Sequence, residues 1–344
     1  MGLPETWHPC EVIPSVVRTI ERLVALDATS GATSAMPAVR EAMRSIPELS
    51  ADTGTLGART SDRLAALAEL SEVIGWILFD AGSYREAHRM NVRALALAEL
   101  CGDRWTARFV LLNDSMLKTH TGAPRSALEA AARANGGTRA LPARVGSLVL
   151  IRQAHAIALL GGHREPMDLM ARAQSRFLDG ISRHDPPWAW WIDQTELLGH
   201  QGWVLARLGR WNQAIPLLYE VTYEAVTTPG PSYRDLFTAQ LLSALTGAGA
   251  WSEAEDLITG LAPRAARIGS VRTTRTLGRT ASRLLERPGP GVPVPLCEAA
   301  AFLLESLPPP PVAAANFAAN FAANSSVNSS VKPSVKSSTR LHCL

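Results

Sequence analysis

Apolar residues recur at intervals of three and four along most of the chain, and alternating runs of β-branched residues are nearly absent. The segment ARTSDRLAALAELSEVIGWILF (58–79) is typical. Its large apolar residues share one face of a helix: Leu64, Leu67, Leu70, Ile74, Ile77 and Leu78. This periodicity predicts an all-α protein.

A glycine follows each of the long apolar segments, and a second helical pattern begins two or three residues later. These glycines are Gly82, Gly122, Gly161, Gly209 and Gly249. They lie about forty residues apart, a period typical of stacked helical repeats. The spacing predicts five helical hairpins between about Arg59 and Gly269.

Residues around the glycines repeat at fixed offsets as well. A small residue precedes the turn by seven positions (Gly75, Gly202), and an aromatic residue follows it by two (Tyr84, Trp211, Trp251). An alanine comes three residues later: Ala87, Ala214 and Ala254. The offsets match the tetratricopeptide pattern, in which small residues let paired helices approach closely and the aromatic fills the gap to the next hairpin. The pattern is weaker after Gly122 and Gly161, where Pro124 and His163 replace the aromatic.

The two ends of the chain differ from this array. Residues 1–50 predict two helices, Val12–Leu26 and Met36–Ile46, separated by DATSGATSA. Residues 288–311 are rich in proline, and a low-complexity string without acidic residues follows. We therefore expect an N-terminal helical cap or linker (1–58), a repeat domain (59–287) and a disordered tail (288–344).

Composition excludes several classes of protein. The chain has 344 residues, is 47% hydrophobic and carries a net charge of +3, so its charge does not favour nucleic acid. Four widely separated cysteines favour neither a zinc site nor a disulfide framework. No apolar run reaches about 18 residues, and no secretion signal is recognisable at the start. These features predict a cytoplasmic protein that does not enter a membrane.

The sequence holds no motif for catalysis. It has no HExxH pair, no P-loop, no GxSxG and no GxGxxG. Its histidines are scattered, and Glu69 and Glu72 share a helix face without an evident acid or base partner. We therefore expect no catalytic residues, no metal and no cofactor.

Five of the nine tryptophans lie between Asp185 and Trp211. Asp185 is suited to cap a helix, and Pro186 and Pro187 suit its first turn. On such a helix Trp188 and Trp191 share one face, Trp190 points elsewhere, and Trp203 follows farther along. Two interpretations remain open: this aromatic cluster (Trp188, Trp190, Trp191) packs the fourth hairpin against the third, or it forms a wall of a ligand groove.

In a tetratricopeptide superhelix the first helix of each hairpin lines the concave face. Counting back from each turn glycine predicts a mixed apolar and polar groove, suited to an extended peptide, an amphipathic helix or a small molecule. Its predicted residues are Glu69, Glu72, Trp76, Phe79, Met116, His120, His155, Glu196, Trp203 and Arg207.

One segment near the end of the array is strongly polarised. In IGSVRTTRTLGRTASRLLER an arginine stripe steps by three and four residues: Arg272, Arg275, Arg279, Arg283 and Arg287. The simpler interpretation is the solvated outer face of the last helix. The sharper one is a contact with phosphate or an acidic partner.

Two blocks carry a resemblance to a known family: LAELSEVIGWILFDAGSYREAHRMNVRALALAELCGD (67–103) and DPPWAWWIDQTELLGHQGWVLARLG (185–209). Together they resemble the C-terminal tetratricopeptide-like region of actinobacterial transcription regulators of the xenobiotic-response-element type. The resemblance extends from about Trp7 to Leu285. It implies regulation of transcription without catalysis, in proteins where a helix-turn-helix domain precedes the array.

We expect that residues 1–50 do not form the helix-turn-helix domain, because DATSGATSA is too long for its turn and Arg40 and Arg44 are balanced by Glu41 and Glu48. We expect a sensor that binds a protein, peptide or small-molecule ligand and does not bind DNA directly; a homodimer is left open. The alternatives are a regulator whose helix-turn-helix lies upstream of Met1 and, least favoured, a helical enzyme with an unrecognised site.

Overall fold

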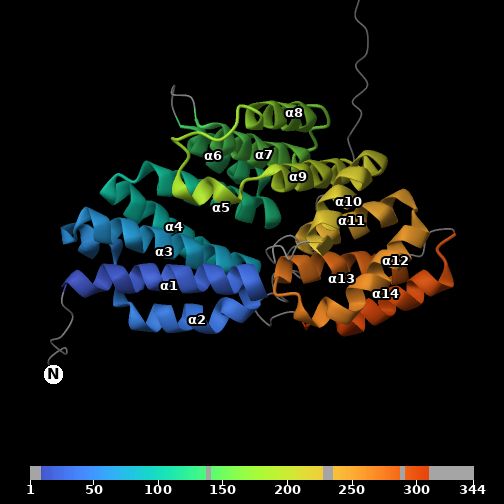
Figure 1. Cartoon of the computed structure of the whole chain (residues 1–344), viewed down its shortest axis with the longest axis horizontal. Helices are drawn as coiled ribbons and strands as arrows, with labels where there is room; N and C mark the ends of the chain where they lie inside the picture. Colours follow the sequence, from blue (N-terminus) through green and yellow to red (C-terminus); the bar gives the residue numbers. More distant parts are fainter. Residues whose placement is uncertain (1–8, 137–140, 228–234, 287–290, 310–344) are drawn as a thin grey trace, which may run out of the picture. The chain divides into compact units, whose positions relative to one another are not determined.

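The computed structural model describes residues 9–136, 141–227, 235–286 and 291–309, and its regular elements there are all helical. Within these described residues, fourteen α-helices pair into seven hairpins of one compact unit that ends at Pro308 (Figure 1). The hairpins are α1 (Pro9–Ser30) with α2 (Ala32–Ser45), α3 (Ser61–Asp80) with α4 (Tyr84–Cys101), α5 (Arg104–His120) with α6 (Pro124–Asn135), α7 (Ala143–Leu159) with α8 (Glu165–Phe177), α9 (Gln194–Arg207) with α10 (Trp211–Thr227), α11 (Asp235–Ala248) with α12 (Trp251–Leu261), and α13 (Val271–Glu286) with α14 (Val294–Ser306). Short 3-10 helices connect some of them: η1 (Pro47–Leu49), η2 (Thr53–Ala58), η3 (Pro187–Trp191) and η5 (Ala262–Arg267).

The five predicted turn glycines are confirmed. Each lies between the two helices of one hairpin and has a positive φ, from 71° at Gly209 to 87° at Gly161. A residue with a Cβ is strained in this left-handed region, so glycine ends the first helix at little cost and lets the chain reverse.

Small residues set the distance between paired helices, as the repeat pattern predicts. A Cβ atom added to Gly75 would lie 2.5 Å from Asn91 Oδ1 on α4, and one added to Gly202 would lie 2.7 Å from Leu218 Cγ on α10. The aromatic after the turn reaches the next hairpin: the Trp211 ring lies so close to Gly247 on α11 that a Cβ there would be 2.8 Å away. Bulkier residues at these glycines would force the helices apart.

The first helices of successive hairpins (α1, α3, α5, α7, α9, α11 and α13) pack side by side, and each second helix packs against the next hairpin. This is the arrangement of a tetratricopeptide-like array, and it places the seven first helices around one inner face. The fold class predicted from the periodicity is therefore confirmed. No described helix is both long and apolar enough to cross a membrane.

The last hairpin meets the first, so the inner face is closed as a ring. Thr33 N at the start of α2 donates to the carbonyl of Gly269, just before α13, at 2.9 Å. The Gly31 and Gly269 backbones touch so closely that a Cβ atom on either would overlap the other. The contact between Gly31 and Gly269 therefore joins the two ends of the array at one edge of its inner face.

The predicted break between the first two helices is wrong. DATSGATSA is almost entirely helical, and only Gly31, with φ of 79°, separates α1 from α2. Thr29 Oγ1 donates to the carbonyl of Ala25 at 2.8 Å, which lets a hydroxyl residue remain inside the last helical turn. Ala32 and Ala35 are buried against the core. The turn composition misled because a tertiary contact at Gly31 fixes where the chain reverses.

The structure also differs from the expectation of an unfolded proline-rich segment after residue 287. Pro293 and Pro295 stand at the start of α14, where a proline without an N–H costs little. Leu296, Ala300 and Leu303 are then buried in the same core as α12 and α13. The predicted disordered string from residue 310 onward lies outside the described residues.

Candidate functional site

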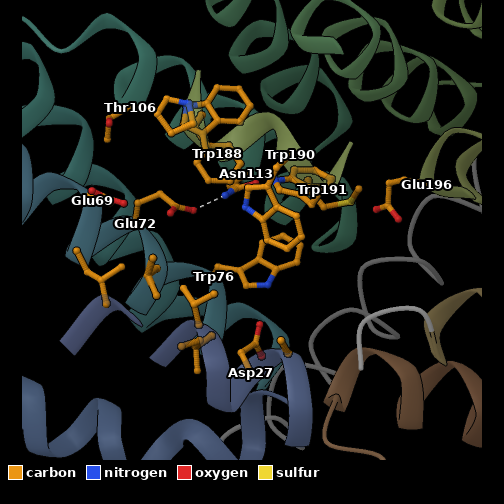
Figure 2. A pocket seen from close by; sticks show the side chains of 18 of the residues that line it. Asp27, Glu69, Glu72, Trp76, Thr106, Asn113, Trp188, Trp190, Trp191 and Glu196 are labelled. Atoms are coloured by element: carbon orange, nitrogen blue, oxygen red, sulfur yellow. Dashed lines mark hydrogen bonds between the residues drawn. The ribbon is translucent and has the colours of Figure 1, made fainter. Parts of the chain in front are cut away.

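A central cavity of about 600 Å³ lies on the inner face. It is lined by residues from α1, α3, α5, α7, α9, α11 and α13, together with η3 and Asp103, which caps α5. A volume in this range suits a small molecule or a few residues of a peptide. Figure 2 shows its side chains, with the tryptophans between Glu72 on one side and Glu196 on the other.

Eight tryptophan and phenylalanine rings line the cavity. They come from five elements: Trp76, Trp105, Phe109, Trp188, Trp190, Trp191, Trp203 and Phe237. Trp188 stacks on Phe109 of α5 with ring centroids 4.4 Å apart and an angle of 9° between the planes. Trp190 remains 64% exposed, and no acceptor among the described residues pairs with Trp188 Nε1. The rings of Trp188 and Trp191 thus contact α5, in the second of the five predicted hairpins, and all three tryptophans line the cavity; their role as a ligand wall stays a prediction.

The predicted helix through these tryptophans is wrong. Residues 187–191 form η3, and α9 begins only at Gln194, where Asp193 Oδ1 accepts from the Glu196 backbone N–H at 2.8 Å. Asp185 instead accepts from the backbone N–H of Ser182 at 3.0 Å. Two prolines and three tryptophans favour a short turn whose Ala189 and Ile192 are buried, and the true helix cap comes eight residues after the predicted one.

The α3 side of the cavity is acidic. Glu72 is 4% exposed, and its Oε1 accepts a hydrogen bond from Asn113 Nδ2 of α5 at 2.5 Å (Figure 2). Burial raises the pKa of Glu72 to about 8, with a further contribution from the charge of Glu69. The pKa of Glu69 is raised too, by burial and by Asp103. No basic side chain of the described residues forms an ion pair with Glu69 or Glu72.

Where α1 meets α3 and α13, a further carboxylate lines the cavity. Burial raises the pKa of Asp27 to about 7; Asp80 raises it further, while Arg272 and a hydrogen bond with Trp76 oppose the shift. Arg272 is itself buried, donates to Asp80 and lies over the rings of Trp76 and Phe79, with Cζ 4.8 and 4.6 Å from their centroids. This ion pair links the last hairpin to the second.

The α7–α9 side holds a buried polar network. Arg152 Nε donates to the carbonyl of Leu112 at 3.2 Å, and its Nη1 lies 3.4 Å from His200 Nε2. His200 Nδ1 lies 2.9 Å from His155 Nε2, and its Nε2 lies 3.5 Å from Glu196 Oε1. Burial lowers the pKa of both histidines and lowers that of Arg152 to about 10. Both histidines are therefore neutral at pH 7, and Arg152 carries the positive charge.

Six of the ten predicted groove residues line the cavity: Glu69, Glu72, Trp76, Met116, Glu196 and Trp203. The other four lie elsewhere on the inner face. Phe79 and His120 pack with Tyr84, whose hydroxyl lies 2.9 Å from His120 Nε2. His155 lies behind His200, and Arg207 lies over the Trp203 ring. Counting back from the turn glycines thus identified residues of the inner face. The role of these residues in binding stays a prediction.

The arginine stripe does not lie wholly on a solvated outer face, because α13 is a first helix and faces inward. Arg272 is 3% exposed, and Arg275 Nη1 donates to the Tyr84 hydroxyl at 2.7 Å. Arg279 and Arg283 are exposed, and Arg287 lies outside the described residues. Arg272 and Arg275 join α13 to α3 and α4. The periodicity of this helix alone could not predict these contacts.

Several lining residues escaped the sequence analysis. Asp27 was assigned to an end cap, Arg152 lies within an apolar helix, and Asn113 and Phe109 belong to a repeat with a weak motif. A usable signal was a charged residue inside an apolar helical run, as at Arg152, because such a residue is buried only with polar partners. Among the described residues, no three His, Cys, Asp or Glu side chains form a group able to hold a metal ion.

Comparisons with known proteins give a likeness of structure only. No protein-family model matches the chain, and no curated protein matches it by sequence. One similar solved structure is a Rap protein crystallised with Competence and Sporulation Factor. It is 12% identical, the match covers 90% of this chain and 99% of that one, and the TM-score is 0.44.

Proposed function

We propose that this chain is a tetratricopeptide-like sensor. It binds a small ligand, a peptide or a segment of a protein in its central cavity and thereby modulates gene expression through a partner, acting in the cytoplasm and without catalysis of its own. The observation that carries the proposal is the cavity itself: about 600 Å³, lined by seven helices and walled by aromatic rings. Apolar clefts and cavities with a few convergent polar groups are typical ligand sites.

The two blocks that resemble actinobacterial regulators of the xenobiotic-response-element type also supply much of this lining. Glu69, Glu72 and Trp76 belong to the first block, and the tryptophans of η3 and Trp203 belong to the second. The resemblance and the cavity therefore rest on the same residues. This coincidence supports a regulatory role for whatever the cavity binds.

The test is to block the cavity without disturbing the core. Val24 on α1 lines the cavity and is 40% exposed, so we expect the substitution Val24→Trp to be tolerated while its ring enters the cavity. Val17 on the same helix is 41% exposed and lies outside the cavity lining, so Val17→Trp is a matched control. Transcripts are measured in a deletion strain of the source organism complemented with each form.

We expect the wild type and Val17→Trp to restore the transcript profile and Val24→Trp to fail, with equal melting temperatures for all three. Full restoration by Val24→Trp would contradict a role for the cavity. An unchanged profile on deletion would contradict the regulatory role. A gel shift with neighbouring genomic DNA, titrated with salt, separates a partner-mediated role from direct DNA binding, because only the latter gives sequence-selective complexes.

A further inference from the structure

The charges that line the cavity are unequal. Five carboxylates face two guanidinium groups; the lining acids are Asp27, Glu69, Glu72, Asp103 and Glu196, and the lining bases are Arg152 and Arg272. Both bases have partners inside the protein, since Arg272 pairs with Asp80 and Arg152 contacts Leu112 and His200. The excess of acid therefore stays within the cavity.

A buried acceptor on the opposite side of the cavity also lacks a partner. Glu196 is 7% exposed, and its Oε1 lies near His200, but no donor among the described residues reaches its Oε2. Leaving a buried carboxylate oxygen without a hydrogen bond destabilises the unliganded protein. A ligand that carries a donor would relieve this cost.

The aromatic wall is suited to positive charge. Guanidinium groups of the protein already lie over several inner rings: Arg272 over Trp76, Arg207 over Trp203 and Arg108 over Trp105, with Cζ 4.8 to 5.4 Å from the ring centroids. The η3 tryptophans (Trp188, Trp190 and Trp191) have no such partner among the described residues. Their π-faces attract a cation in the same way.

We propose that the central cavity binds an organic cation, with its charged head against Glu72 and Glu69 and its apolar body among the η3 tryptophans. The head is a protonated amine, a guanidinium or a quaternary ammonium, carried either by a free small molecule or by a side chain of a short peptide. This inference rests on the proposed function and names the ligand class for that site. A bound cation also favours the charged form of Glu72, which burial otherwise opposes.

The experiment compares three probes of one shape by calorimetry on the full chain at pH 8: 4-phenylbutylamine, 4-phenylbutanol and 4-phenylbutyrate. We expect the amine to bind about tenfold or more tightly than the alcohol, because it adds a charge-assisted hydrogen bond and a cation–π contact. The carboxylate should bind most weakly, since it meets like charges.

Two variants locate the charged head. Glu72→Gln keeps the shape of the side chain and removes its charge, so amine affinity should fall about tenfold while alcohol affinity changes less than about twofold. Glu99→Gln changes an exposed acid on α4 and should alter neither. Equal loss of amine and alcohol affinity in Glu72→Gln would mean that the substitution damages the cavity; Glu69→Gln must then show the selective loss, or the inference fails.

The outcomes separate the inference from the proposed function. If the alcohol or the carboxylate binds as well as the amine, the cavity is a ligand site and the preference for cations is wrong. If no probe binds, the inference is overturned, and the Val24→Trp transcripts decide the proposed function independently. Blocked Phe-Lys and Phe-norleucine amides distinguish the sources: tighter binding of the Phe-Lys amide than of the free amine assigns the cation to a peptide.

Discussion

The two sides of the central cavity bury polar groups in opposite ways. On the α7–α9 side, Arg152, His155, Glu196 and His200 contact one another within 2.9 to 3.5 Å, and the charges of the arginine and the glutamate oppose each other. On the α3 side, Glu72 accepts one hydrogen bond from Asn113 and lies near a second carboxylate. One side sets a positive charge against a negative one within the fold, whereas the other gathers acidic groups without a basic partner among the described residues.

This difference indicates different roles. A buried network in which opposite charges and hydrogen-bonding groups face one another makes the local arrangement specific. Removing one member then leaves its partners buried without compensation. A buried acid beside another acid destabilises the fold when both are charged. Such a group suits a site that binds a positively charged ligand. Substitutions on the two sides should therefore change stability in different ways.

The largest expected effect comes from removing Arg152. The substitution Arg152→Met leaves Glu196 buried without its nearby guanidinium and ends the hydrogen bond to the carbonyl of Leu112. We expect a loss of about 3–5 kcal/mol in the free energy of unfolding, measured by urea denaturation. Arg172→Met, on the exposed face of α8, should change it by less than about 0.5 kcal/mol. Equal stability of both variants would contradict the network.

The α3 side of the cavity should make the fold less stable as pH rises. The folded-state pKa of Glu72, about 8, lies above its ordinary value of 4.5, so its contribution to stability is complete below pH 4.5 and is lost as pH rises through about 8. The groups that line the cavity with it are Asp27, Glu69, Asp103, Arg152, Glu196 and Arg272. Asp27, with a pKa of about 7, adds to the loss.

The substitution Glu72→Gln removes this titration. Relative to the wild type, it should raise the free energy of unfolding at pH 9 by about 2–4 kcal/mol, since each pKa unit corresponds to about 1.4 kcal/mol, and should have a much smaller effect at pH 5. Thermal unfolding of both proteins from pH 5 to 9 measures the difference. Parallel curves would show that Glu72 does not titrate in this range, and Glu99→Gln supplies the exposed control.

The buried histidines should have a smaller effect on stability, in the opposite direction: they make the fold less stable as pH falls. Burial lowers the pKa of His120, His155 and His200 below 6.5. Below this pH the histidines of the unfolded chain become protonated while those of the folded chain stay neutral, so the stability of the fold decreases. Removing one of the three in His155→Gln should reduce the loss between pH 6.5 and 5 by about 1 kcal/mol. Urea denaturation at the two pH values tests this, and an unchanged loss would exclude His155 as a contributor.

Much of the fold could be predicted because its signals are local. A glycine with positive φ ends the first helix in each of the five predicted hairpins, and at Gly82 and Gly209 a glycine seven positions earlier strengthens the signal, so these turns can be predicted from the sequence. The break at Gly31 and the helix α14 could not be read this way. The first is fixed by contact with Gly269, far along the chain, and the second by burial of Leu296 and Leu303 in a neighbouring core.

The site was predicted only in part for the same reason. Helix register placed Glu72, Trp76 and Trp203 on the inner face, but it carries no information on ring closure. Closure turns Arg272 inward and adds α1, with Asp27, to the lining. The η3 turn was missed because its helix-capping signal at Asp185 competes with a better cap at Asp193.

The smallest expected change in stability concerns the most exposed ring of the cavity. Trp190 is 64% exposed, so Trp190→Ala removes little buried surface and should leave the melting temperature unchanged, corresponding to less than about 0.5 kcal/mol. If the η3 tryptophans hold the apolar body of a cation, the same variant should weaken binding of 4-phenylbutylamine severalfold, since it removes an aromatic face that packs on that body. A large loss of stability would instead make Trp190 part of the core. An unchanged affinity would restrict the ligand wall to Trp188 and Trp191, which contact Phe109 of α5.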